Sequence, residues 1–163
     1  MVISHKDLAS VRAKYPDKKI VFCSGSFDLV HPGHVLILEA CKKLGDILVV
    51  AVGRDKDIAE NKGPTRPIMG EDLRLKMVDS LKPVDYALLN PPHPEGGWNS
   101  QTAPLEIMFG LFRPDVWAVY RDAEQMEERE ALSKKIGTPI VAVEVSRTVS
   151  TTQLIKKIRN LPE

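Results

Sequence analysis

Runs of apolar residues alternate with segments of helical spacing along most of the 163-residue chain. The apolar runs are short and contain few polar interruptions, which is typical of strands buried on both faces of a parallel sheet. They cover residues 19–24, 46–53, 84–90, 115–120 and 139–145. Between and after them, apolar residues recur three and four positions apart, and this spacing predicts helices over 33–45, 70–82, 103–112, 122–137 and 150–160.

Strands that alternate with helices predict an α/β fold. We expect a Rossmann-like three-layer α/β/α domain with a mainly parallel five-stranded sheet, formed as a single domain by residues 1–163. Ligands of such sheets bind beyond the carboxyl ends of the strands, where the strand order reverses. Two loops interrupt the alternation, a basic one at 59–69 and a proline-rich one at 90–102. Long loops of this kind are either functional or surface insertions.

Composition narrows the class of protein. The chain is 43% hydrophobic and 28% charged, as in a globular domain, and its 23 basic and 22 acidic residues give a net charge of +1. This balance argues against broad binding to nucleic acid or to a membrane surface. No run approaches the ~20 apolar residues of a membrane span, and the N-terminal segment is too charged for a signal peptide. The two cysteines form no C-x-x-C pair, so we expect reduced thiols and a cytoplasmic protein.

The stretch GSFDLVHPGH, residues 25–34, follows the first predicted strand and leads into the first predicted helix. Its first glycine allows a phosphate to approach backbone N–H groups in a tight turn. The His-Pro-Gly-His segment at 31–34 then begins a helix, whose N-terminus attracts an anion and whose histidines can donate hydrogen bonds to phosphate oxygens. The histidines are also spaced like a zinc pair, but no third ligand of suitable spacing is evident.

With these residues the chain resembles the cytidylyltransferase-like family of nucleotidyltransferases, whose signature is a glycine-containing turn followed by H-x-G-H. A second motif of the family, of the type I-S-T-T or I-S-T-S, is matched by VSTT at 149–152. Arg147 precedes this motif, and the motif opens the last predicted helix. The two motifs lie near opposite ends of one predicted domain, so the resemblance covers nearly the whole chain.

Within the family, the chain is most similar to the heptose-1-phosphate adenylyltransferases of lipopolysaccharide precursor synthesis. The likeness rests on residues 18–52 and on the segments NKGPTRPI, KPVDY and LFRPDVW further along. Glycerol-3-phosphate cytidylyltransferases and archaeal FAD synthetases share the same framework. The chain departs from the heptose pattern at residues 119–122, where a K-G-G-D-like turn is usual, and in the long 90–102 loop. Both departures lie where acceptor and nucleotide specificity could differ.

The resemblance implies one type of reaction. A phosphate monoester attacks the α-phosphate of ATP or CTP in line, and pyrophosphate leaves, normally with Mg²⁺ and without a covalent enzyme intermediate. The implied acceptor is a sugar phosphate, D-glycero-D-manno-heptose 1-phosphate in the first place, with glycerol 3-phosphate, another phosphate monoester or FMN as alternatives. A homodimer is the usual assembly of the family. A nucleotide-binding protein without catalysis is a further alternative, supported by the altered turn at Tyr120-Arg121.

The resemblance also implies roles for individual residues. Three side chains are expected to act in catalysis, namely His31, His34 and Lys62. A larger set is expected to contact the nucleotide: Ser24, Gly25, Ser26, Phe27, Gly33, Lys42, Asp122, Arg147, Ser150, Thr151 and Thr152. The acceptor is expected to meet Asp28, Asp55, Arg66 and Arg74. No side chain is expected to ligate a metal directly.

Several of these residues also suit a purely structural role. Asp28 is suited to a turn or a helix cap, and Ser150 is a common N-cap residue. Lys42 is equally typical of a solvated helix face, and Arg74 of a structural ion pair. The sequence leaves both kinds of role open for all four.

Overall fold

A five-stranded sheet forms the centre of the molecule, in a computed structural model that describes residues 1–92, 100, 102–121, 126–145 and 149–161. The strands run in the order β3-β2-β1-β4-β5, and each neighbouring pair is parallel. Their bounds are β1 (Ile20–Gly25), β2 (Ile47–Val52), β3 (Tyr86–Leu89), β4 (Val116–Tyr120) and β5 (Ile140–Val143). The strand order reverses between β1 and β4, so the carboxyl end of β1 lies at the switch point.

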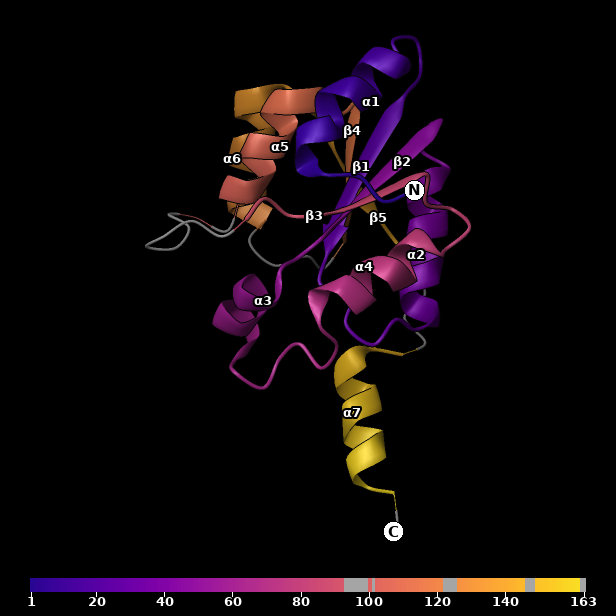
Figure 1. The fold of residues 1–163 in the computed structure, drawn as a ribbon, viewed down its shortest axis with the longest axis vertical. Helices are drawn as coiled ribbons and strands as arrows, with labels where there is room; N and C mark the ends of the chain where they lie inside the picture. The colour runs from indigo at the N-terminus through magenta and orange to yellow at the C-terminus, as the bar shows by residue number, and fades with distance from the viewer. Residues whose placement is uncertain (93–99, 101, 122–125, 146–148, 162–163) are drawn as a thin grey trace.

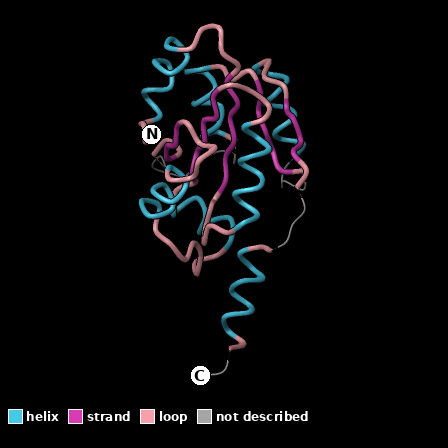
Figure 2. The backbone as a smooth tube through the Cα atoms, turned by 90° about the vertical axis from the view of Figure 1, so that its right-hand side faces the viewer, coloured by secondary structure: helices cyan, strands magenta, loops and turns pink. Residues whose placement is uncertain are grey.

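Helices cover both faces of this sheet (Figures 1 and 2). Their bounds are η1 (His5–Asp7), α1 (Leu8–Lys14), α2 (Pro32–Lys42), α3 (Asp55–Lys62), α4 (Glu71–Asp79), α5 (Ala103–Phe112), α6 (Met126–Ile136) and α7 (Thr151–Arg159). Alternate strand residues point to opposite faces and form two buried clusters, one with α1, α5 and α6 and the other with α2 and α4. Helices α3 and α7 lie beyond the carboxyl ends of the strands, and α7 projects from the body.

The amino ends of the strands share one device. Three aspartates, each one residue before a strand, accept a hydrogen bond from the backbone N–H at the start of the neighbouring strand. The bonds run from Lys19 N to Asp46 (2.9 Å), from Leu48 N to Asp85 (2.6 Å) and from Ile20 N to Asp115 (2.7 Å). A cation lies beside each carboxylate: Lys18 beside Asp46, Lys42 beside Asp85 and Arg12 beside Asp115. These contacts fix the register of β1, β2 and their neighbours from one edge of the sheet.

The predicted α/β fold with a parallel five-stranded sheet and helical layers on both faces is confirmed. Two helices were not predicted, α1 and α3. Helix α3 occupies residues 55–62, so the first part of the predicted 59–69 loop is helical. Helix α3 is polar and its one buried residue is Ile58, so it carries no apolar periodicity by which the sequence could reveal it.

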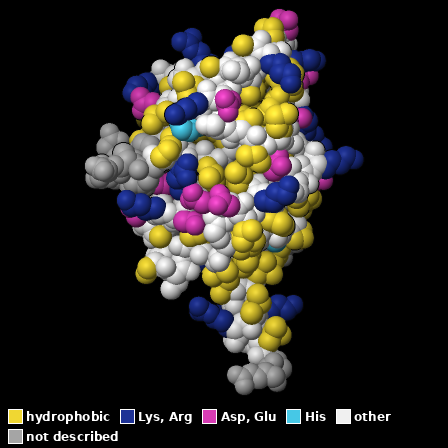
Figure 3. All heavy atoms as spheres, in the orientation of Figure 1, with side chains coloured by type: hydrophobic (Ala, Val, Ile, Leu, Met, Phe, Trp, Pro, Cys, Tyr) yellow, Lys and Arg dark blue, Asp and Glu magenta, His cyan; other side chains and the backbone are white. Residues whose placement is uncertain are grey.

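Charged side chains of both signs are interspersed over the face shown in Figure 3, while apolar side chains gather where α7 meets the body. Helix α7 has no buried residue, and Ile158 on it is 61% exposed. Within the described part of the chain, no helix has the length and apolar character needed to cross a bilayer.

Candidate active site

The chain turns sharply after β1. Phe27 and Leu29 both have a φ of 49°, in the left-handed region that residues other than glycine seldom adopt. The buried Phe27 ring packs edge-on against His34, with 5.5 Å between the ring centroids. It also covers Gly25, where a Cβ atom would come within 3.1 Å of the ring. A side chain at position 25 would therefore require the Phe27 ring to shift slightly.

Asp28 holds this turn to two other segments. Its side chain is almost fully buried and accepts hydrogen bonds from the backbone N–H groups of Ile68 (2.9 Å) and Met69 (3.0 Å). It also forms an ion pair with Arg66 at 2.8 Å. Its backbone carbonyl accepts a hydrogen bond of 2.8 Å from the Thr151 hydroxyl at the start of α7. Both carboxylate oxygens thus have protein partners, which matches the structural role left open for this residue.

His31 and His34 lie at the N-terminus of α2 with their rings stacked, 3.9 Å between centroids. The backbone N–H of His31 donates to Nδ1 of His34 at 3.4 Å. Gly33 makes the close packing possible, because a Cβ there would lie 3.0 Å from the His31 ring and 3.2 Å from the carbonyl oxygen of Val149. The helix start, the imidazole pair and the segment before α7 are therefore in direct contact.

Burial keeps both imidazoles neutral near pH 7. The pKa of His34 is lowered to about 4, mainly by burial and to a smaller extent by the charges of His31 and Lys62, while Asp28 opposes the change. Burial also lowers the pKa of His31. Because Nδ1 of His34 accepts a hydrogen bond, the proton of the neutral ring belongs on Nε2. His34 can therefore donate one hydrogen bond from Nε2 without carrying a charge of its own.

A cavity of about 520 Å³ opens at this place, and we call it the histidine cavity. It brings together most of the predicted site residues: Ser24, Gly25, Ser26, Phe27, Asp28, His31, Gly33, His34, Lys62, Arg66, Ser150, Thr151 and Thr152. They come from the end of β1, the start of α2, the end of α3, the following loop and the start of α7. Tyr120, at the end of β4, also lines it.

The start of α7 forms one wall of the histidine cavity. Ser150 is its N-cap, and its hydroxyl accepts a hydrogen bond of 3.2 Å from the backbone N–H of Gln153. The Gln153 side chain in turn accepts a hydrogen bond of 2.8 Å from the Ser150 N–H. This reciprocal cap fixes where the helix begins, and Ser150, Thr151 and Thr152 at that point line the cavity. The cap and the proposed nucleotide contact are compatible roles for Ser150.

Arg74 and Asp55 support the site from behind. Arg74 is fully buried and donates hydrogen bonds to the carbonyls of Met69 (2.9 Å), Gly53 (2.7 Å) and Ser26. It also pairs with Asp55 at 2.7 Å. One guanidinium thereby joins the turn after β1, the end of β2 and the loop before α4. The sequence left open a phosphate contact or a structural ion pair for Arg74, and the structure supports the ion pair. Neither Arg74 nor Asp55 lines the histidine cavity.

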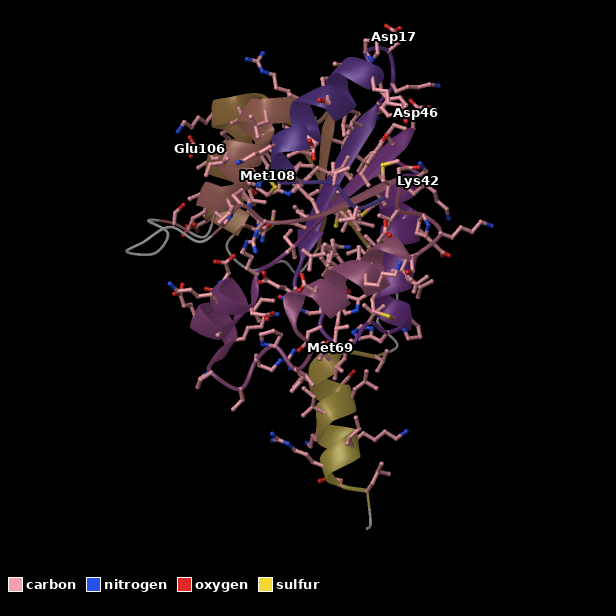
Figure 4. All side chains as sticks on the ribbon, viewed as in Figure 1. Asp17, Lys42, Asp46, Met69, Glu106 and Met108 are labelled. Atoms are coloured by element: carbon pink, nitrogen blue, oxygen red, sulfur yellow. The ribbon has the colours of Figure 1, made fainter. Side chains whose placement is uncertain are left out.

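Lys42 is not brought to the cavity. It lies at the far end of α2, where it donates to the carbonyl of Asp46 at 2.6 Å and pairs with Asp85. Figure 4 shows Lys42 and Asp46 in the upper half of the molecule, far from Met69 beside α7. The physical reason is helix length, because each residue advances the helix by about 1.5 Å and Lys42 lies eight positions after His34. Two other predicted contacts, Asp122 and Arg147, lie outside the described residues.

A second cavity, of about 370 Å³, shares the turn Ser24–Ser26 with the first, and we call it the polar cavity. Its other described lining residues come from α3, the end of β3, the segment just before α5, α5 itself and α6. They are Asp57, Glu60, Asn61, Asn90, Ser100, Pro104, Leu105 and Arg129. The sequence analysis singled out none of these. The available signal was three polar residues at helical spacing in 57–61, which became recognisable only once α3 was known to be a helix.

Comparison with known proteins gives the family. The family model described as cytidylyltransferase-like matches residues 22–157. The bifunctional protein HldE of Gluconobacter oxydans is 35% identical over 147 residues, which cover 88% of this chain and 28% of that protein. The chain thus spans little more than a quarter of HldE. The FAD synthase of Ferroglobus placidus is 39% identical over 150 residues, covering 88% of this chain and 90% of that protein.

Two solved structures are similar to this chain in fold. The lipopolysaccharide core biosynthesis protein of Thermoplasma volcanium is 32% identical, with a TM-score of 0.60 over 79% of this chain and 99% of that one. A pantoate-beta-alanine ligase of Francisella tularensis has a TM-score of 0.65 at 16% identity, with 99% of this chain and 73% of that chain covered, and shares the fold. The family match spans both the turn after β1 and the start of α7, which line the histidine cavity. The chain therefore belongs to the cytidylyltransferase-like family of nucleotidyltransferases.

Proposed function

We propose that this protein transfers an adenylyl group from ATP to a sugar 1-phosphate, D-glycero-D-manno-heptose 1-phosphate in the first place, and releases pyrophosphate. One observation carries the proposal. The glycine turn after β1, two neutral histidines and the N-terminus of α7 all line one cavity at the switch point of a parallel sheet. Backbone N–H groups and neutral imidazole donors together suit the oxygens of a polyphosphate.

The histidine cavity would hold the triphosphate. Lys62 lines it as an exposed cation at the end of α3, and Arg66 adds a guanidinium that is already paired with Asp28. The neutral Nε2–H of His34 would donate to a phosphate oxygen whose negative charge grows in the transition state. A neutral donor held in place binds the phosphate oxygen more strongly in the transition state, where that oxygen is more negative, than in the ground state. This difference in binding lowers the activation barrier.

The reaction balances without redox chemistry or a covalent enzyme intermediate. An oxygen of the acceptor phosphate attacks the α-phosphorus, a new P–O bond forms, and the bond from the α-phosphorus to the bridging oxygen of the β-phosphate breaks. Pyrophosphate leaves with that electron pair. The acceptor phosphate is ionised at neutral pH, so no side chain has to remove a proton from it. The chain's contribution is to position the two phosphates and to neutralise charge.

Mg²⁺ fits this site as part of the substrate. The described residues contain no group of three His, Cys, Asp or Glu side chains that could form a metal cage. The Asp28 carboxylate in the cavity already has three protein partners. We therefore propose that Mg²⁺ arrives on the triphosphate oxygens, as it does in many nucleotide sites, where it neutralises phosphate charge. Lys62 and the histidines would bind the phosphate oxygens that the ion leaves free.

FMN is the second candidate acceptor. The observation that favours it is the FAD synthase of Ferroglobus placidus, 39% identical and matched over 90% of its own length. The heptose proposal is supported by HldE, whose relevant part is 35% identical, and by the name of the Thermoplasma volcanium structure. Both candidates are phosphate monoesters, so they share the chemistry proposed for the histidine cavity. They differ in the group attached to the phosphate, which is a sugar in one and a flavin in the other.

Pyrophosphate release tests the proposal directly. The protein is incubated with Mg²⁺, with ATP, CTP, GTP or UTP, and with heptose 1-phosphate, glycerol 3-phosphate or FMN. We expect release with ATP and heptose 1-phosphate. Release only with ATP and FMN would replace the acceptor, release only with CTP would replace the nucleotide, and no release with any pair would overturn the proposed activity.

A further inference from the structure

A third cavity, of about 350 Å³, lies between α7 and the segment that precedes α4, and we call it the basic cavity. Its lining includes Arg66, Ile68, Thr152, Lys156 and Arg159. Arg66 and Thr152 also line the histidine cavity, so the two cavities adjoin. We infer that the basic cavity binds the pyrophosphate that the reaction releases, with Lys156 and Arg159 as binding residues. This inference rests on the proposed function, because it places one of the two products of that reaction.

The first support is the arrangement of cations around the basic cavity. Lys156 and Arg159 lie four and seven positions after Thr152, so all three lie on one face of α7, the face that lines the cavity. Arg66 lines it from the segment before α4, so cationic side chains from two segments surround one space. The whole chain has a net charge of only +1, so this concentration of positive charge is local. Basic side chains flank α7 in Figure 3.

The second support is the hydrogen-bonding capacity of these cations. The side chains of Lys156 and Arg159 are exposed, and neither forms a hydrogen bond or an ion pair with another described residue. Arg66 uses a terminal nitrogen for its ion pair with Asp28, and its Nε is buried without a hydrogen-bond partner among the described residues. Ammonium and guanidinium groups donate several hydrogen bonds each and suit phosphate oxygens. A ligand with several phosphate oxygens could therefore bind all three cations.

Asp28 holds the two walls of the basic cavity in a fixed relation. Its carboxylate accepts a hydrogen bond from the Ile68 N–H (2.9 Å) and pairs with Arg66 (2.8 Å), both on one wall. Its backbone carbonyl accepts a hydrogen bond from the Thr151 hydroxyl (2.8 Å), at the start of the other wall. The basic cavity is thus fixed relative to the turn after β1, to which Asp28 belongs. A site formed before its ligand arrives binds that ligand at a lower cost in ordering.

The chemistry of the reaction supplies the ligand. When the bond from the α-phosphorus to the bridging oxygen breaks, that oxygen keeps the electron pair, so the released pyrophosphate is more negative than the same two phosphates were in ATP. Lys156 and Arg159 do not line the histidine cavity, and they offer the product two cations that lie beyond it. A pyrophosphate that moves past Thr152 would leave the histidine cavity on the side where α7 projects (Figure 1).

The position of Lys156 and Arg159 near the end of α7 also suits a structural role. The C-terminus of a helix carries partial negative charge and attracts cations in its last turn. Lys157 meets this requirement equally well, since it lies in the same turn, but it does not line the basic cavity. Lys157 is therefore the matched control, because it has the same charge, helix and exposure and lies on another face.

Calorimetric titration of pyrophosphate in the presence of Mg²⁺ tests the inference. We expect Lys156→Gln and Arg159→Gln to weaken binding, and the double variant to raise the dissociation constant at least about 10-fold, because two charged donors are lost. Lys157→Gln should change it less than about 2-fold. AMP, whose single phosphate would bind in the histidine cavity, should bind the wild type and every variant equally. All three lysine and arginine positions are exposed, so the variants should keep the fold, which circular dichroism checks.

Product inhibition gives a second readout. In the double variant, the pyrophosphate concentration that halves turnover should rise at least about 10-fold, while the KM for ATP changes less than about 3-fold. An equal rise in both would place the γ-phosphate of bound ATP in the basic cavity, and it would overturn the assignment to the product.

Inorganic phosphate separates the product from a free anion of another source. If phosphate binds as tightly as pyrophosphate and loses as much affinity in the double variant, the cavity is a general anion site and the assignment to the product is overturned. Unchanged pyrophosphate binding in the double variant, with turnover intact, would overturn the inference and leave the function standing. No turnover with any substrate pair would overturn the proposed function, and loss of pyrophosphate binding in the double variant would then still support the cavity as a pyrophosphate site.

Discussion

The amino and carboxyl edges of the sheet use charged side chains in opposite ways. At the amino edge, Asp46, Asp85 and Asp115 bind backbone N–H groups of neighbouring strands and pair with nearby cations. At the carboxyl edge, the chain opens into two cavities whose walls include neutral histidines, a lysine and the carboxylates of α3. One edge fixes strand register, and the other surrounds two cavities.

The carboxyl edge also has a supporting layer of its own. Asp28 with Arg66 and Asp55 with Arg74 are ion pairs within protein, and they hold the loops that form the cavity walls. A charged residue at the ligand edge is therefore not evidence of ligand contact by itself. These four side chains already have protein partners, and those partners give each of them a structural role. The comparison of the edges can be tested by changing one residue at a time.

The largest effect is expected for Arg74→Met. It leaves three carbonyls without a donor and breaks the pair with the half-exposed Asp55, so we expect the free energy of unfolding to fall by about 3–5 kcal/mol, mostly from the lost hydrogen bonds. Activity should fall as well, because the turn after β1 loses its support. Urea unfolding measures the change. Arg121→Met, which breaks an exposed pair with Glu144, is the control and should cost less than about 1 kcal/mol.

His34→Ala should affect activity without affecting the fold. Loss of a positioned donor to a developing negative charge typically lowers kcat by about 100- to 1000-fold. We expect a fall in this range, with an unchanged circular dichroism spectrum. His5→Ala, at the short helix near the N-terminus, should keep wild-type turnover. A His34→Ala variant as active as the wild type would remove this residue from the mechanism.

The depressed pKa of His34 predicts a dependence of stability on pH. In the folded state the pKa lies at about 4, against 6.5 for the unfolded chain, so between these values only the unfolded state binds the proton. Stability is therefore constant above pH 6.5 and falls as the solution is acidified toward pH 4, by at most about 3 kcal/mol from this residue. Unfolding at pH 7, 5.5 and 4.5 measures the slope. His34→Asn should show a shallower loss, and an identical slope would contradict the assignment.

Asp115→Asn tests the amino edge. Burial opposes ionisation of Asp115, but hydrogen bonds from Arg12 and from the Ile20 N–H hold the pKa of its carboxyl below its usual value. The ionised form therefore stabilises the fold at neutral pH, and this contribution is lost as pH falls through the folded pKa. We expect the neutral variant to lower the free energy of unfolding by about 1–2 kcal/mol. Acceptor and ATP kinetics at 25 °C should match the wild type, and Asp17→Asn is the exposed control.

The smallest effect is expected for Lys42→Ala. Its pair with Asp85 is about one-third exposed on each side, so the stability change should lie between about 0 and 1 kcal/mol. Turnover and the KM for ATP should be unchanged, because the lysine lies at the far end of α2 from the histidine pair. A KM for ATP raised severalfold in this variant would mean that the two edges are not separate in function.

The parts of the molecule that the sequence predicted are those with a local signal. The five strands are continuous apolar runs, and the histidine pair and the VSTT segment are motifs whose elements begin where their residues suggest. Helix α3 was missed because a polar helix with one buried residue has no periodic apolar face. Lys42 was expected at the nucleotide from the family resemblance, although its position eight residues after His34 on the same helix already separates it from the histidine pair by about 12 Å.

The polar cavity could not be predicted for a different reason. Its lining residues come from β1, α3, the end of β3, α5 and α6, and none of these contributions is unusual within its own segment. Glu60 or Asn90 alone looks like any polar residue at the end of an element. Only the packing of five separate segments gives the group a shape and a charge distribution. Information of this kind lies in the tertiary contacts, which pattern and motif do not encode.

The bond from the Thr151 hydroxyl to the Asp28 carbonyl has a consequence for how the site is assembled. It joins residues 123 positions apart, whereas the two buried clusters contain no residue of α7. The sheet can therefore bury its core before α7 docks, but the histidine cavity then still lacks one wall. Completion of the core and completion of the cavity are thus separate steps.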